Sequence, residues 1–180
     1  MSNQTSATGR RGKPSLKVLV VCSFLAAISI VLTRYGSIML AGGSIRLGFG
    51  NLPIVFAGLL LGPFAGGLTG LVGDLLGFVM APQGTFHPGF TISSVLTGVI
   101  PGLVARYGGG DRFSPRVVIT ACVLIYLLIG LGLNTLWLTH LLGQAFLVLL
   151  PARALSQGIV TAITIMILLF LSRYSKQWEI

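Results

Sequence analysis

Acidic residues are almost absent from this chain of 180 residues, which has three of them against 12 lysines and arginines. Charged residues of both signs make up only 8% of the sequence, and its mean hydropathy is +0.95. Soluble domains carry roughly 25% charged residues, so this composition excludes a soluble globular protein. It predicts an integral membrane protein, and the basic residues lie at the ends of apolar segments rather than in a patch for nucleic acid.

Several kinds of chemistry lack the residues that they need. The only lysines are Lys13, Lys17 and Lys176, and none of them completes a phosphate-binding loop, so we expect no ATPase motif. No zinc-binding His-Glu-x-x-His helix and no nucleophile motif occurs. The cysteines, Cys22 and Cys122, lie in apolar stretches without metal-ligand spacing. We therefore expect no metal site, no cofactor and no catalytic residues.

Apolar runs long enough to cross a membrane recur along the chain. A crossing needs about 20 apolar residues, and four runs meet this requirement: 17–40, 90–107, 115–138 and 151–171. A further apolar region, 52–81, is too long for one crossing and short for two. Because Gly62-Pro63 at its middle is a helix-breaking pair, we divide it into helices 50–62 and 64–81.

The distribution of positive charge supports six helices over five, since lysine and arginine are retained on the cytoplasmic side. Six helices with a cytoplasmic N-terminus leave nine basic residues inside and three outside, whereas five helices leave five inside and seven outside. The predicted fold is an all-α, compact bundle of six transmembrane helices. Its membrane domain is 17–173, and its tails, 1–16 and 174–180, are both cytoplasmic.

The N-terminal apolar run also admits a second interpretation as a cleaved signal peptide, because basic residues precede it. No small-x-small cleavage site closes the run, and Arg34 and Tyr35 follow it directly. We therefore favour a retained first helix in a multi-pass protein of the cell membrane.

Polar and aromatic residues gather on the outer face of this topology. They are Arg34, Arg46, Asp74, Phe86, His87, Phe90, Asn134, Trp137 and Arg153. Asp74 costs about 2.5 to 3.5 kcal/mol at bilayer depth, which predicts a function for it. Singly, the arginines could extend to lipid headgroups and Trp137 could be an interfacial anchor. Both histidines, His87 and His140, could be ordinary loop residues.

Together these residues favour a ligand site. Three arginines on the side where basic residues are disfavoured indicate an anionic partner, and arginine binds carboxylates with two hydrogen bonds. Phe86, Phe90 and Trp137 can stack on a flat ring. Asp74 offers two acceptor oxygens to a ring edge with adjacent N–H donors.

The order and spacing of these residues resemble the folate family of substrate-binding (S) components of energy-coupling factor (ECF) vitamin transporters. The matching stretches are Leu32-Thr33-Arg34, Arg46-Leu47-Gly48-Phe49-Gly50-Asn51-Leu52-Pro53, Gly62-Pro63 through Gly66, Gly70, Asp74, Pro82-x-Gly84, Phe86, Pro88-Gly89-Phe90-Thr91, Asn134-Thr135-x-Trp137-Leu138 and Arg153. The resemblance covers nearly the whole chain from Lys17 to Leu171.

This resemblance implies a prokaryotic S component that captures folate at the outer face of the plasma membrane. A membrane coupling subunit and two cytoplasmic ATPase subunits would drive uptake. The nine residues of the outer face would bind folate. Phe86, Phe90 or Trp137 would stack on the flat pterin ring, Asp74 would bind its amino-oxo edge, and the arginines would bind the glutamate carboxylates.

Such families contact the coupling subunit through an Ala-x-x-x-Ala face on the first helix. The nearest equivalents here are Cys22-x-x-x-Ala26 and Ser23-x-x-x-Ala27, so the strict pattern is not met. The alternatives are an S component for another vitamin or a queuosine precursor, a small intramembrane enzyme that uses His87 or His140 on an amphiphilic substrate, and a purely structural subunit.

Overall fold

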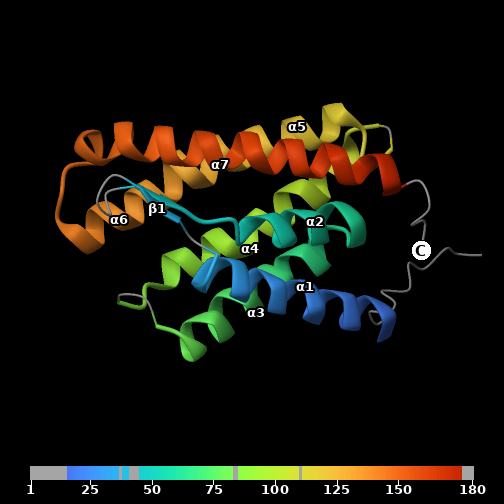
Figure 1. Cartoon of the computed structure of the whole chain (residues 1–180), viewed down its shortest axis with the longest axis horizontal. Helices are drawn as coiled ribbons and strands as arrows, with labels where there is room; N and C mark the ends of the chain where they lie inside the picture. The colour runs from blue at the N-terminus through green and yellow to red at the C-terminus, as the bar shows by residue number, and fades with distance from the viewer. Residues whose placement is uncertain (1–15, 37, 41–44, 83–84, 110, 176–180) are drawn as a thin grey trace, which may run out of the picture.

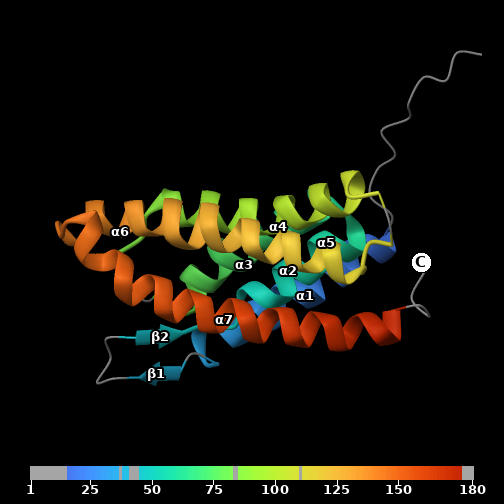
Figure 2. The same ribbon diagram turned by 90° about the horizontal axis from the view of Figure 1, so that it is seen from above.

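The computed structural model describes residues 16–36, 38–40, 45–82, 85–109 and 111–175. Its elements, shown in Figure 1, are α1 (Leu16–Arg34), β1 (Ile38–Leu40), β2 (Ile45–Leu47), α2 (Asn51–Leu61), α3 (Pro63–Met80), α4 (Pro88–Tyr107), α5 (Pro115–Leu124), the π-helix η2 (Ile125–Leu133), α6 (Asn134–Leu142) and α7 (Phe146–Ser175). The helices run roughly along the long axis of the molecule, and α5, η2 and α6 follow one another as a single rod (Figure 2).

Glycine contacts hold α2, α3 and α4 closely together. A Cβ at Gly98 of α4 would overlap the backbone of Gly66 in α3, and a Cβ at Gly58 of α2 would overlap the Gly98 carbonyl. Small residues allow the backbones of membrane helices to approach in this way. These three helices form one tightly packed unit, against which α1 also packs.

The hydrophobic core joins this unit to the rod and to α7. Leu59 of α2, Val118 of α5, Ile129 of η2 and Leu168 of α7 belong to one cluster, and each is at most 1% exposed. Between membrane helices such side chains stabilise the bundle through close van der Waals packing, because lipid tails are as apolar as leucine. The two halves of the chain therefore share one core.

The break predicted at Gly62-Pro63 is confirmed. Helix α2 ends at Leu61, Gly62 has a φ of 95°, which suits glycine, and Pro63 begins α3 at the position where proline is best tolerated. The described residues include five helices that are long and apolar enough to cross a membrane, and the 11-residue α2 is a shorter apolar helix. A multi-pass helical membrane protein is the result.

The predicted helix 17–40 is wrong at its end, whereas the all-α fold class holds apart from one short hairpin. Helix α1 stops at Arg34, and β1 pairs with β2 in an antiparallel hairpin in which Met39 lies opposite Arg46. Gly36 donates its backbone N–H to the Val31 carbonyl at 3.2 Å, as glycine often does at helix ends. The β-branched Ile38 and Ile45 then favour strands.

The last two predicted helices are too short. The rod continues to Leu142, where Gly143 adopts a φ of 66° and ends it. Helix α7 begins at Phe146 rather than Pro151, which lies inside the helix beyond its first turn and removes one backbone hydrogen bond there.

Candidate functional site

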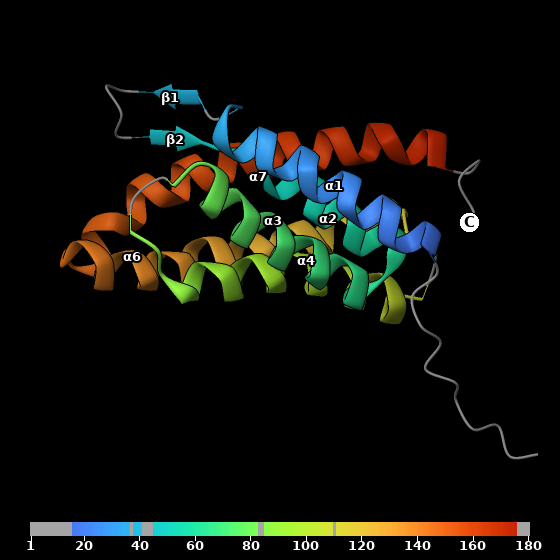
Figure 3. The same ribbon diagram turned by 90° about the horizontal axis from the view of Figure 1, so that it is seen from below.

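One end of the bundle collects most of the predicted site residues. We call it the hairpin end, since it carries β1 and β2, the C-terminal ends of α1, α3 and α6, and the N-terminal ends of α2, α4 and α7 (Figure 3). Both described ends of the chain, at Leu16 and Ser175, lie at the opposite end (Figure 1). The fold therefore brings the predicted outer loops together.

An aromatic cluster at the hairpin end contains three of the predicted residues. The ring centroids of His87 and Trp137 lie 5.4 Å apart, with an angle of 38° between the ring planes. Those of His87 and Phe90 lie 5.9 Å apart, with an angle of 72° between the planes. Gly89 lies under the Trp137 indole, where a Cβ would overlap the ring. The Trp137 Nε1 atom is buried and has no hydrogen-bond partner in the described chain.

His87 also forms the N-cap of α4. Its Nδ1 atom accepts a hydrogen bond from the Gly89 backbone N–H at 3.1 Å. An accepting nitrogen carries no proton, so the neutral ring has its proton on Nε2. The cap fixes the ring beside Trp137 and leaves Nε2 as a donor.

Asp74 has a partner within the protein. Its Oδ2 atom accepts a 2.6 Å hydrogen bond from the Thr91 hydroxyl, which ties α3 to the first turn of α4. Gly77, one turn further along α3, leaves space for the Arg34 guanidinium, because a Cβ there would lie 3.4 Å from Arg34 Nε. Arg34 of α1 thus lies against the same part of α3 as Asp74.

Arg153 lies on α7, a few residues along the chain from those that line a cavity between α2, η2 and α7. Its Nε atom is buried without a hydrogen-bond partner among the described residues. The adjacent Ala154 carbonyl accepts a hydrogen bond from the Tyr126 hydroxyl at 3.2 Å, which joins α7 to η2. Arg153 is therefore held where the rod and α7 meet.

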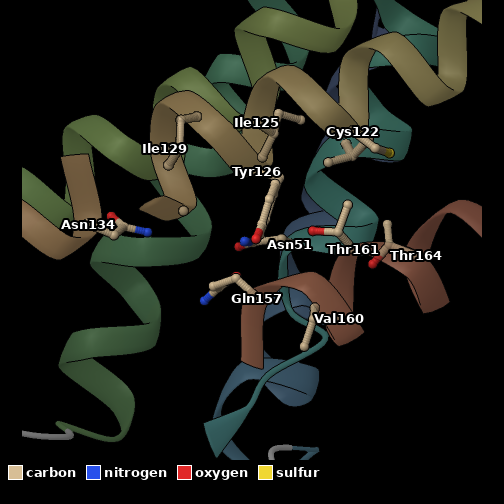
Figure 4. Close-up of a pocket in the computed structure, with 12 residues that line it drawn as sticks. Asn51, Cys122, Ile125, Tyr126, Ile129, Asn134, Gln157, Val160, Thr161 and Thr164 are labelled. Atoms are coloured by element: carbon tan, nitrogen blue, oxygen red, sulfur yellow. The ribbon is translucent and has the colours of Figure 1, made fainter. Parts of the chain in front are cut away.

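The cavity itself has a volume of about 30 Å³ and is shown in Figure 4. Asn134 lies at one end, Cys122 and Thr164 lie at the other, and Tyr126 and Gln157 lie between them. The polar residues of its wall are uncharged: Asn51, Tyr126, Asn134, Gln157, Thr161 and Thr164. This volume holds about two water molecules, so a larger ligand requires its walls to move apart.

Sequence reasoning missed most of this wall. Asn51 belongs to a stretch that resembles the folate family, but its sequence context predicts no role for it, and Tyr126 lies in a uniformly apolar run. Gln157, Thr161 and Thr164 occupy positions i, i+4 and i+7 of α7, a spacing that places them on one face of the helix. A polar stripe within an apolar span was the signal that could have found them.

Of the aromatic residues predicted for the site, Phe86 is the one that lies outside the aromatic cluster. Phe86 packs on Phe78 of α3, with ring centroids 5.1 Å apart, and is 45% exposed. Arg46 belongs to β2, but its side chain lies outside the described residues. Asn134, by contrast, lines the cavity, and its Oδ1 atom is buried without a partner in the described chain.

The two small-residue pairs of α1 differ in exposure. Cys22 and Ala26 are buried at 5% and 2% exposure, and the Cys22 thiol lies 3.8 Å from the Ala65 carbonyl of α3. Ser23 and Ala27 are exposed. Only the second pair is open to a partner.

The sequence and fold match known transport proteins. Residues 13–175 match the family model of the ECF-type riboflavin transporter, S component. The folate transporter FolT of Clostridium novyi (strain NT) is 34% identical over 144 residues, which are 80% of this chain and 81% of that protein. The chain belongs to the S components of ECF-type transporters.

Solved structures agree with this membership. A crystal structure of FolT bound with folic acid is 25% identical to this S component, with a TM-score of 0.74 over 87% of this chain and 94% of that one. The S component for biotin from an ECF-type ABC transporter shares the fold, with a TM-score of 0.67 at 19% identity over 87% and 91% of the two chains. The predicted membership in the ECF S components is confirmed, and the matched proteins are named as transporters rather than enzymes.

Proposed function

We propose that this S component captures folate with high affinity at the outer face of a prokaryotic plasma membrane. The observation that carries the proposal is a set of three buried polar atoms without partners in the described chain: Trp137 Nε1, Asn134 Oδ1 and Arg153 Nε. An unsatisfied buried polar atom costs about 1 to 3 kcal/mol. A ligand that pairs with these atoms recovers that cost, and the 34% identity to FolT supports folate as this ligand.

The donors and acceptors suit the two halves of folate. The uncharged wall of the cavity can exchange hydrogen bonds with a neutral pterin ring without burying a charge. The aromatic cluster of His87, Phe90 and Trp137 supplies faces and edges for the ring, and Phe86, packed on Phe78, is a further exposed aromatic side chain at this end. Arg153, Arg34 and Arg46 supply the positive charge for the glutamate carboxylates.

Two carbonyl-type oxygens are available to the N–H donors of the pterin edge. Asp74 has its Oδ2 atom engaged by Thr91, which leaves Oδ1 for the ring. Asn134 Oδ1 has no partner in the described chain. We assign both as acceptors for the ring, and the substitutions discussed below separate them.

We further propose six membrane crossings with both termini in the cytoplasm, as the charge distribution requires. Helix α2 counts as the sixth crossing, although its 11 residues span only about 16 Å. The hairpin end is then the outer end. Residues 1–16 and 174–180 are the cytoplasmic tails of the membrane domain 17–173.

Energy would come from a membrane coupling subunit and two ATPase subunits. We place the coupling contact on the exposed pair Ser23 and Ala27, since small side chains allow a partner helix to approach closely. Cys22 and Ala26 support this face from within the bundle.

Ligand binding to the purified chain in detergent tests the substrate. We expect folate to bind with a Kd below about 1 μM, measured by calorimetry, and riboflavin and biotin to bind far more weakly. Riboflavin is the critical competitor, because the matching family model carries its name. Tighter binding of riboflavin than of folate would overturn the assignment, while turnover of an amphiphile that disappears in His87→Ala would favour an enzyme.

A further inference from the structure

The nine-residue π-helix η2 is the most unusual backbone feature of the chain. Its hydrogen bonds run from a residue to the fifth residue before it, as in the bond from the Asn134 backbone N–H to the Ile129 carbonyl. π-Helices are rare, usually last one turn, and often lie at functional sites. This one forms part of the cavity wall.

The π-helix sets which side chains of the rod share the cavity wall with Asn134. The residues of the rod that line the cavity are Cys122, Ile125, Tyr126, Ile129, Gly130 and Asn134. At about 100° per residue, an α-helix would place Tyr126, Gly130 and Asn134 on one face, because they are spaced by four residues, but would turn Ile125 to the side opposite Asn134. The wider turn of η2 aligns residues spaced by four and by five, which brings Ile125 and Ile129 onto the wall beside Asn134.

A buried side chain closes this wide turn. The Thr135 hydroxyl donates a 3.2 Å hydrogen bond to the carbonyl of Gly130, five residues earlier, and Thr135 is 0% exposed. Threonine in an α-helix usually bonds a carbonyl three or four residues back. This longer reach follows the π geometry and fixes the backbone beside Asn134.

We propose that η2 and Thr135 position Asn134 on the wall of the substrate cavity, so that Thr135 is a positioning residue for ligand binding. The inference rests on the proposed function, since it assigns the Asn134 carboxamide to the bound folate. Thr135 itself is buried beneath the wall and touches no ligand. Its hydroxyl acts through the orientation of the neighbouring carboxamide.

A double-mutant cycle tests the positioning role. Thr135→Val removes the hydroxyl and is expected to weaken folate binding about fivefold, in line with the loss of one hydrogen bond. In an Asn134→Ala background, the same substitution is expected to change the Kd by less than about twofold. Thr135→Ser retains the hydroxyl and is expected to restore the parent affinity. Equal losses in the two backgrounds would mean that Thr135 is merely structural and would overturn the proposal.

The controls separate this inference from the proposed function. Failure of the parent chain to bind folate would overturn the proposed function and the positioning role with it. Folate binding by the parent, together with equal effects of Thr135→Val in both backgrounds, would overturn the positioning role alone.

Discussion

Gly89 is the position where the smallest change should have the largest effect on the site. It lies under the Trp137 indole, and a Cβ there would also lie 2.8 Å from the His87 Nδ1 atom that accepts the Gly89 N–H. Alanine at this position must displace the indole, break the cap of α4, or do both. Overpacking of this kind costs about 1 to 3 kcal/mol.

This cost can fall on folding or on binding, so both are measured. If the strain is released by a shift of Trp137, the Kd for folate rises between about 5- and 150-fold, the equivalent of the overpacking energy. If it remains in the folded chain, the midpoint of thermal unfolding in detergent falls. Trp137 and Trp178 are the two tryptophans of the chain, so a change in fluorescence that is absent in a Trp137→Phe background reports the shift of the indole.

A matched control is available at the same end of the molecule. A Cβ at Gly48 meets no atom within 4 Å, so Gly48→Ala should leave stability and affinity unchanged. A Gly89→Ala variant that matches the parent in both folate Kd and thermal midpoint would refute the packing of Trp137 on Gly89, and with it the aromatic cluster as described.

Three further predictions address the roles of single residues. Asp74→Asn should weaken folate about tenfold or more through loss of its charge, whereas Thr91→Val should cost about two- to fivefold; equal losses in calorimetry would show that Asp74 acts only by holding α4. Arg153→Ala should weaken folate about tenfold, whereas a pterin analogue without any carboxylate should bind this variant and the parent equally well; an equal loss for both ligands would remove the role of Arg153 at the carboxylates. Ala27→Leu should retain folate binding but abolish uptake with the coupling module, and normal uptake in whole cells would contradict the assigned face.

The sequence predicted the parts of the fold that depend on local chemistry. Gly62-Pro63 interrupts an apolar stretch, and no neighbouring residue is needed to recognise that break. The end of α1 was less accessible, because the apolar residues 38–40 suit a helix in a membrane as well as a strand. The pairing of Met39 with Arg46 depends on contact between two segments, which a pattern of hydropathy does not contain.

The candidate site was predicted to a similar degree. The residues of the aromatic cluster were found because polar and aromatic side chains in the outer loops are unusual, but the partner of Asp74 was not, since Thr91 lies on another helix. Asn134 was predicted, but its place beside Ile125 on the cavity wall was not, because 115–138 was predicted as one membrane helix and an α-helix has a period of 3.6 residues. With that period, Asn134 cannot share a face with Ile125, and the π-helix that joins them is stabilised by tertiary contacts such as the bond from Tyr126 to the Ala154 carbonyl of α7.

The site residues on α3 and α4 and those on the rod and α7 also differ in how rigidly the fold holds them. The glycine contacts of α2, α3 and α4 are between backbones and leave no room for adjustment, so Asp74, His87 and Phe90 stand on the rigid unit. Asn134 and Arg153 stand on the rod and on α7, which face the cavity with uncharged polar side chains. Under the proposed function, the cavity of about 30 Å³ enlarges to admit folate, and we expect this movement in the rod and α7. Trp137 of the rod rests on Gly89 of the rigid unit, so this contact joins the two parts of the site. A ligand that moves the rod away from the rigid unit must first move the Trp137 indole, which is why Gly89→Ala is informative.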